Sequence, residues 1–325
     1  MRRRRAPAIC RSGKNACGYG GTGPLVLLIH GFPESWYAWR HQLPAIAAAG
    51  FRAVAVDVRG YGRSSKPCEA AAYRMADHVA DNVGVVHALG ARSATVVGHD
   101  WGSTIAAGSA LLMPEVFTSV ALLSVPYAPR NGHRPTEVFS RIGGDEEFYV
   151  SYFQTPGRAE AEIEPDVRGW LAGFYAGLSS DTMPSGGEGS LFFVPPKARL
   201  RDRIPSGARP SWLSEADLDF YAAEFERTGL TGALNRYRNV DRDWEDLAAW
   251  DGAPIEQPSL FIGRELDAST TWMADAVESF PETLPGLVSS HILRGCGHWI
   301  QQERVADVNR LLTEWLGSPQ VRAAG

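Results

Sequence analysis

Gly98-His99-Asp100-Trp101-Gly102 is the stretch that decides the fold, because an apolar run over residues 94–98 ends there and a helix-like spacing begins at Trp101. Glycines stand two positions before and after Asp100, which lets neighbouring backbone approach a strained turn between a strand and a helix. An ordinary turn with an aspartate at the helix N-cap is the competing interpretation, and the whole pattern disfavours it. The stretch therefore predicts a nucleophile elbow with Asp100 at its centre.

On both sides of this turn, short apolar runs alternate with longer helix-like stretches. The expected strands before residue 126 cover residues 25–30, 51–57, 94–98 and 119–123, with helices over 36–49, 74–89 and 101–113. Residues 127–250 are aromatic, broken by prolines and largely helical; strands then follow over 258–263 and 288–293, with a final helix over 304–316. This alternation predicts an α/β protein whose mostly parallel sheet is flanked by helices. Its core consists of residues 25–126 and 251–325, with a helical cap over 127–250.

The first 24 residues lack such a pattern. They hold five glycines and six Arg or Lys residues without an alternating apolar run, so we expect an irregular lead-in over residues 1–24. Residues 18–23 formally fit a dinucleotide fingerprint, but they precede a strand instead of following one and opening a helix. We expect no nicotinamide or flavin cofactor. We also expect no zinc site at Cys10 and Cys17, which have no nearby histidine.

Composition excludes several classes of protein. The 325 residues include 32 Lys or Arg and 37 Asp or Glu, and the resulting net charge of −5 gives no overall basic field for nucleic acid. The longest aliphatic run near the N-terminus has five residues, far below the roughly 18 of a membrane span. Four cysteines are too few for a disulfide scaffold in a chain of this length. We expect a cytoplasmic protein that acts on a small molecule. The sequence leaves the oligomeric state open, and a homodimer is one of the possibilities.

An aspartate at the elbow points to a particular reaction. No Gly-x-Ser-x-Gly stretch occurs, so a serine nucleophile is not indicated. A carboxylate, with an ordinary pKa of about 3.9, is ionised at neutral pH and attacks saturated carbon without help from a base. Its attack on an acyl carbon would give an unstable anhydride, whereas attack on saturated carbon gives an ordinary ester. The substrate is therefore expected to carry a leaving group on saturated carbon, such as an epoxide oxygen or a halide.

Hydrolysis of that ester needs a base and a site for negative charge. His298 follows the strand ending near residue 293 and is the candidate base, and Asp267, after the strand at 258–263, is the candidate carboxylate that orients it. Both lie just beyond the carboxyl ends of strands, where open α/β sheets build their sites. We expect the oxyanion hole to use the backbone amides of Phe32 and Trp101, the latter directly following the nucleophile.

These residues resemble the epoxide hydrolases of the α/β-hydrolase fold, and most of all the bacterial, mycobacterial-type members. The resemblance runs from about residue 25 to 316, and the motifs that carry it cover residues 30–33, 59–64, 98–102, 152–160, 235–239 and 297–303. It implies the order nucleophile, acid, histidine along the chain, met here by Asp100, Asp267 and His298. It also implies a helical cap inserted after the sixth strand, an epoxide and water as the reactants, and a vicinal diol as the product.

In that family, two cap tyrosines reach over the nucleophile. The resemblance places the second at Tyr237, within Asn235-Arg236-Tyr237-Arg238-Asn239, and the first at Tyr149. Tyr152 remains a rival for Tyr149, because positions 149 and 152 share one face of a helix. A phenol with an ordinary pKa of about 10 stays protonated at pH 7 and donates to a developing alkoxide. Without the resemblance, all three would be taken for packed amphipathic residues.

Two alternatives remain. A haloalkane dehalogenase shares the Asp nucleophile and the following Trp, but such enzymes commonly have Asn after the His-Gly pair, where this chain has Phe32. A fluoroacetate dehalogenase would have Arg in place of Trp101. The second alternative is a non-catalytic ligand-binding protein of the same fold. It has no support in the sequence, because every expected catalytic position holds a competent residue.

Overall fold

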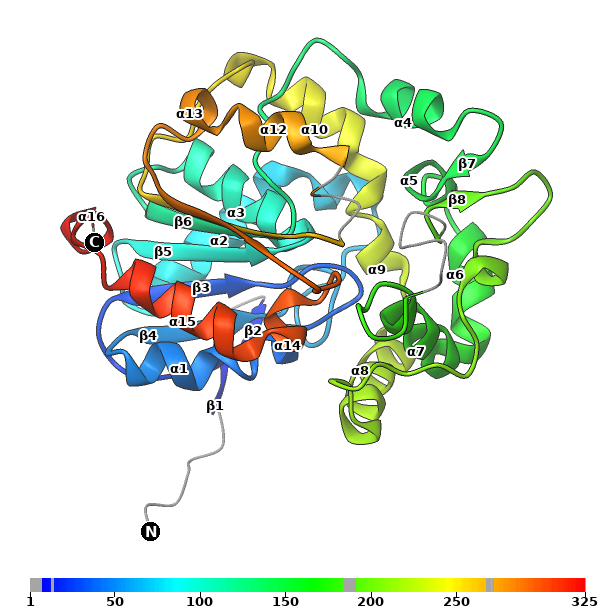
Figure 1. The fold of residues 1–325 in the computed structure, drawn as a ribbon, viewed down its shortest axis with the longest axis horizontal. Coiled ribbons are helices and arrows are strands. Elements are labelled where there is room, and N and C mark those ends of the chain that lie inside the picture. Colours follow the sequence, from blue (N-terminus) through cyan, green and yellow to red (C-terminus); the bar gives the residue numbers. More distant parts are fainter. Residues whose placement is uncertain (1–7, 13–14, 184–190, 267–269, 271, 325) are drawn as a thin grey trace.

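The computed structural model describes residues 8–12, 15–183, 191–266, 270 and 272–324. Its centre is an eight-stranded sheet with the strand order β1-β2-β4-β3-β5-β6-β9-β10 (Figure 1). The six strands from β4 to β10 in this order are parallel, and β1 and β2 add an antiparallel edge. The strands are β1 (Ala8–Ser12), β2 (Asn15–Gly20), β3 (Leu25–Ile29), β4 (Arg52–Val56), β5 (Ala94–His99), β6 (Phe117–Leu123), β9 (Ser259–Arg264) and β10 (Leu287–Leu293).

Helices cover both faces of the sheet, because the side chains of its buried strands alternate between two cores (Figure 1). The first, third and fifth residues of β3 pack in the core shared with α2 (Met75–Ala88) and α3 (Trp101–Leu112). The second and fourth pack in the opposite core with α1 (Gln42–Ala48) and α15 (Val305–Leu316). The unbroken apolar run of β3 is therefore needed to fill both layers.

Shorter helices complete the sheet-bearing part of the chain. They are η1 (Trp36–Trp39), η2 (Ala70–Tyr73), α12 (Ala274–Glu278), α13 (Phe280–Thr283), α14 (Ile300–Glu303) and α16 (Pro319–Ala324). Within the described ranges, no helix has both the length and the apolar character that crossing a bilayer requires.

The expectation of an irregular lead-in over residues 1–24 is wrong for its two described stretches. Residues 8–12 and 15–20 pair as an antiparallel hairpin, in the register Cys10 with Cys17. The second strand then pairs with β4, in the register Cys17 with Val56. The hydrogen-bond partners of the second strand come from the edge of β4. This pairing cannot be predicted from a glycine-rich sequence that lacks an alternating apolar pattern.

Residues 127–250, between β6 and β9, form a mainly helical segment at the carboxyl end of the strands, and we call it the cap segment (Figure 1). Its only described strands, β7 (Glu147–Phe148) and β8 (Phe193–Val194), pair with each other. Its helices are α4 (Pro135–Gly143), α5 (Tyr149–Tyr152), α6 (Arg158–Ile163), η3 (Glu164–Asp166), α7 (Val167–Gly177), η5 (Leu200–Arg203), α8 (Glu215–Thr228), α9 (Thr231–Leu234), η6 (Tyr237–Asn239), α10 (Val240–Asp246) and η7 (Ala248–Trp250).

The expected α/β class and mostly parallel sheet are confirmed. Every strand predicted from residue 25 onward is present, with ends that differ by at most two residues. The predicted helix over residues 36–49 is divided into η1 and α1. Arg40, the C-cap of η1, and His41, the N-cap of α1, lie between the two helices. The carboxyl ends of β3, β5 and β9 meet at one edge of the sheet, which brings the loops that follow them together.

Candidate active site

The turn at Asp100 has the geometry of a nucleophile elbow. Asp100 connects β5 to α3 with φ 55° and ψ −125°, a conformation that non-glycine residues rarely adopt. A Cβ atom on Gly98 would lie 1.9 Å from the carbonyl oxygen of Gly102, and one on Gly102 would lie 2.0 Å from that of Ile29. The turn therefore closes only because both flanking positions are glycine, as the sequence predicts.

Two backbone amides hydrogen-bond the Asp100 carboxylate. The Phe32 amide donates to Oδ1 at 2.8 Å, and the Trp101 amide also hydrogen-bonds the carboxylate. Gly31 permits this approach, because a Cβ there would lie 2.3 Å from Oδ1. The structure thus brings both predicted oxyanion-hole donors to the predicted nucleophile.

Burial raises the pKa of Asp100 to about 6, against the opposing effects of His99 and the amides of Phe32 and Trp101. The side chain still keeps 15% of its surface accessible, so a reactant can reach it. A carboxylate with this pKa is mostly ionised at neutral pH and more basic than an exposed one. Both properties suit a nucleophile.

His298 lies on the other side of the carboxylate. Its Nε2 is 3.6 Å from Oδ2 of Asp100, the oxygen that the Phe32 amide does not hold. The loop between β10 and α14 that carries His298 is fixed by Glu303, whose carboxylate accepts from the amides of Gly297 and Trp299 at 3.0 Å each. The predicted base and nucleophile are therefore neighbours, although 198 positions separate them in the sequence.

The surroundings of Nδ1 of His298 include a residue that sequence reasoning missed. Arg264, the last residue of β9, is fully buried, and its guanidinium contacts Nδ1 of His298 and donates to Oγ of Ser124 at 3.3 Å. Asp267, the predicted orienting carboxylate, lies outside the described residues. The only sequence signal for Arg264 is a charge at the end of a buried strand.

A second buried pair, Glu34 and His99, was also missed. Neither side chain is exposed; Nδ1 of His99 lies 3.0 Å from the Glu34 carboxylate, and Nε2 lies 2.8 Å from the carbonyl oxygen of His298. Burial lowers the pKa of His99, but Glu34, Asp100 and the His298 carbonyl outweigh it and raise this pKa overall. The raised pKa favours the cationic form of His99 beside the nucleophile. His99 stands inside the motif at residues 98–102, and Glu34 directly follows the one at 30–33, but nothing in the sequence pairs them.

The cap segment places aromatic side chains over the nucleophile. The ring of Tyr237 in η6 lies 5.0 Å from that of Trp101 and 5.3 Å from that of Phe32, and 6.0 Å from the ring of Tyr149. Burial, with Tyr149 and Asp100 nearby, raises the pKa of Tyr237 well above 10. Tyr237 therefore stays protonated at neutral pH.

Tyr152 faces elsewhere. Its hydroxyl donates to the Glu162 carboxylate, and the guanidinium carbon of Arg158 lies 3.5 Å from the centre of its ring. Tyr149, at the start of the same short helix, instead contacts the ring of Tyr237. The two rivals thus have different surroundings, although a helical face was expected to carry both.

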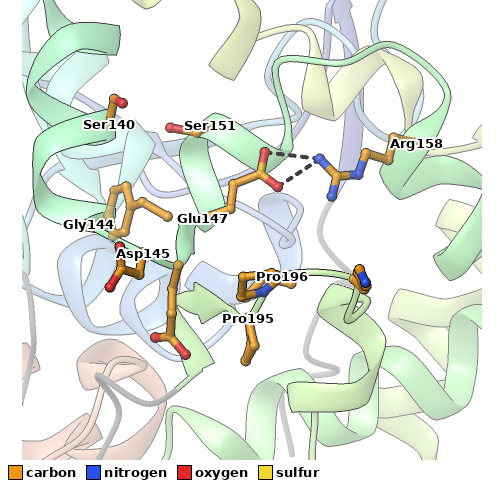
Figure 2. Close-up of a pocket in the computed structure, with 12 residues that line it drawn as sticks. Ser140, Gly144, Asp145, Glu147, Ser151, Arg158, Pro195 and Pro196 are labelled. Atoms are coloured by element: carbon orange, nitrogen blue, oxygen red, sulfur yellow. Dashed lines mark hydrogen bonds and ion pairs between the residues drawn. The ribbon is translucent and has the colours of Figure 1, made fainter.

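A cavity of about 410 Å³ opens elsewhere on the cap segment, among α4, β7, α5 and the turn after β8 (Figure 2). An ion pair of 2.8 Å between Glu147 and Arg158 lies at its wall. Its described lining contains none of the predicted catalytic residues, so the cavity is separate from the candidate active site.

Comparison with known proteins agrees with this geometry. The family described as alpha/beta hydrolase fold matches residues 24–305. Epoxide hydrolase B of Mycobacterium tuberculosis is 42% identical over 91% of this chain and 92% of its own length. The structure of an epoxide hydrolase from an endophytic Streptomyces is 71% identical, with a TM-score of 0.94 over 96% of each chain. That of epoxide hydrolase A from Mycobacterium thermoresistibile is 40% identical, with a TM-score of 0.88 over 96% of this chain and 98% of its own.

The chain therefore belongs to the epoxide hydrolases of the alpha/beta hydrolase fold. The resemblance to mycobacterial-type members noted from the motifs is confirmed.

Proposed function

We propose that this protein hydrolyses epoxides to vicinal diols through a covalent ester on Asp100. The observation that carries the proposal is that the two oxygens of the Asp100 carboxylate have different partners. Oδ1 is held by the Phe32 amide, while Oδ2 faces His298 at 3.6 Å. The names of the similar proteins, which are epoxide hydrolases, support the same reaction.

In the first step, Oδ2 attacks a carbon of the epoxide. The new bond joins Oδ2 to that carbon, the carbon–oxygen bond of the three-membered ring breaks, and the ring oxygen leaves as an alkoxide that stays attached to the substrate. Tyr149 and Tyr237 are the proposed acids that protonate it. The contact of Tyr152 with Glu162 favours Tyr149 over Tyr152 for this role.

In the second step, water attacks the carbonyl carbon of the ester. His298 takes a proton from this water on Nε2, and the negative charge develops on Oδ1, where the Phe32 amide already donates. Collapse of the tetrahedral intermediate breaks the bond between Cγ and Oδ2, and the diol oxygen takes the proton back from His298. The second proton of the water, left on the Asp100 carboxyl group, replaces the proton that the tyrosine gave to the alkoxide, so both groups return to their starting states. We propose Asp267 as the carboxylate that orients His298 and stabilises its imidazolium.

The two cap tyrosines favour an epoxide over a haloalkane. An alkoxide needs a proton when the ring opens, whereas a halide leaves as a weakly basic ion that needs none. Within the proposal, residues 127–250 act as a cap domain on a core of residues 25–126 and 251–325. A cytoplasmic location and a homodimer stay predictions.

Diol release tests the proposal most directly. Purified protein is incubated with a panel of terminal and aryl epoxides beside a panel of haloalkanes, and diol and halide are both measured. We expect diol from epoxides, and none above background from the Asp100→Ala variant. Faster halide release than diol release would favour a dehalogenase, and no turnover of either panel would favour a binding protein.

A further inference from the structure

We propose that Trp272 is a specificity-determining residue that binds the apolar arm of epoxides with an aromatic or long alkyl substituent. The proposal rests on the proposed epoxide hydrolysis and names the substrate class that the site prefers. Trp272 lies between β9 and α12, and 46% of its surface is exposed. A single exposed hydrophobic residue is ordinary. Trp272, however, belongs to a cluster of rings that leads to the nucleophile.

The outer part of this cluster joins two distant stretches of the chain. The ring of Trp272 lies 5.4 Å from that of Phe192, 5.7 Å from that of Phe148 and 5.9 Å from that of Phe193. The three phenylalanines come from the β7 and β8 region of the cap segment, whereas Trp272 follows β9 of the sheet. All three contacts are edge-to-face, at 64° to 69°, an arrangement that aromatic rings favour.

The cluster continues inward without a break. The ring of Phe192 lies 4.9 Å from that of Tyr149, which lies 6.0 Å from that of Tyr237, which lies 5.0 Å from that of Trp101. Tyr149 and Trp101 are only partly buried, and Asp100 keeps some exposed surface, so solvent reaches the inner end as well. A line of aromatic contacts therefore connects the surface at Trp272 to the site of attack.

This arrangement of rings determines which epoxide substituents are stabilised when the substrate binds. In the proposed binding mode, the epoxide ring lies between Asp100 and the two proposed acids, and its substituent extends from Tyr149 along Phe192 toward Trp272, whose rings are in contact. These rings offer apolar faces, so an alkyl or aryl arm is stabilised by leaving water. The short arm of a small epoxide ends before Trp272. The structure thus assigns Trp272 a contribution to substrate binding that grows with the length of the epoxide substituent.

Two substrates that react at the same group but differ in their arms test the proposal. Diol formation from phenyl glycidyl ether and from 1,2-epoxypropane is measured in the wild type, Trp272→Ala and Trp272→Phe. We expect Trp272→Ala to reduce kcat/KM for the phenyl substrate about tenfold, mainly through KM, because an aromatic contact and the burial around it are lost. For 1,2-epoxypropane the change is expected to stay below about twofold, and Trp272→Phe retains most of the activity because a ring remains.

Trp250→Ala is the matched control, since Trp250 is exposed to a similar extent, at 37%, and borders a different group of residues around Tyr127 and Leu247. It should change neither substrate's kcat/KM. Equal losses for both substrates in Trp272→Ala, or no loss for either, would overturn the proposal. Failure of the wild type to form diol from either epoxide would instead contradict the proposed function, whatever the variants do.

Discussion

The rate of attack by Asp100 is expected to rise with pH around a midpoint near 6. Only the ionised carboxylate is a nucleophile, and burial raises the pKa of Asp100 to about 6. The sign follows from the charge, because protonation at low pH removes the attacking lone pair. From this pKa, about 90% of Asp100 is ionised at pH 7 and about 9% at pH 5. Ester formation should therefore be about tenfold slower at pH 5 than at pH 7.

The His298→Gln variant provides the assay, because it removes the titration of the base and stops the reaction at the ester. Rapid mixing with a saturating epoxide, acid quenching and intact-protein mass spectrometry give the rate of ester formation at each pH. Tyr237 does not interfere, since its pKa is raised well above 10. Asp100→Ala, mixed under the same conditions, measures alkylation at other side chains.

Equal rates at pH 5 and pH 7 would contradict this reasoning. Such a result would place the pKa of Asp100 near the ordinary value of 3.8, as for an exposed carboxylate. It would mean that His99 and the backbone amides of Phe32 and Trp101 fully compensate for burial.

Three further predictions concern single steps or stability. In His298→Gln, an ester on Asp100 should accumulate with no release of diol, and mass spectrometry should show a mass gain equal to that of the epoxide; blocked turnover without an adduct would contradict the two-step scheme. The double variant Tyr149→Phe, Tyr237→Phe should slow ester formation by about 10² to 10⁴ while binding persists, whereas a comparable loss in Tyr152→Phe alone would transfer the role of Tyr149 to Tyr152. Asp100→Asn should increase the free energy of unfolding at pH 8 by up to about 3 kcal/mol, because the raised pKa makes the ionised carboxylate unfavourable above pH 6. Below pH 3.8 the gain should vanish in denaturant titrations, since both side chains are then neutral.

The elbow could be predicted because its cause is local. Two glycines and a strand-to-helix change within five residues leave few other conformations, and the Cβ clashes at Gly98 and Gly102 give the steric reason. The parallel sheet was predictable for a similar reason, since runs buried on both faces are apolar throughout. The N-terminal hairpin was not, because its pairing depends on the edge of β4 and not on its own pattern.

Contacts between distant residues explain what else was missed. Glu34 and His99 are 65 positions apart, and each is consistent with an ordinary turn until the fold brings them together. The different surroundings of Tyr149 and Tyr152 also could not be predicted from the sequence, because they depend on contacts in the folded chain. The helical rule placed both on one face, but α5 is only four residues long, and Tyr152 at its end is held by Glu162. A periodicity argument has little force over so short a helix.

The elbow also links the two halves of the proposed reaction through one carboxylate. The Phe32 amide, which donates to Oδ1, withdraws charge and opposes attack, and by itself this would make Asp100 a poorer nucleophile. Burial acts in the other direction, and the net pKa of about 6 leaves the group ionised at neutral pH yet more basic than an exposed aspartate. Once the ester forms on Oδ2, the same amide lies on the oxygen where charge appears when water attacks. A donor that opposes the first step is therefore already in place for the second.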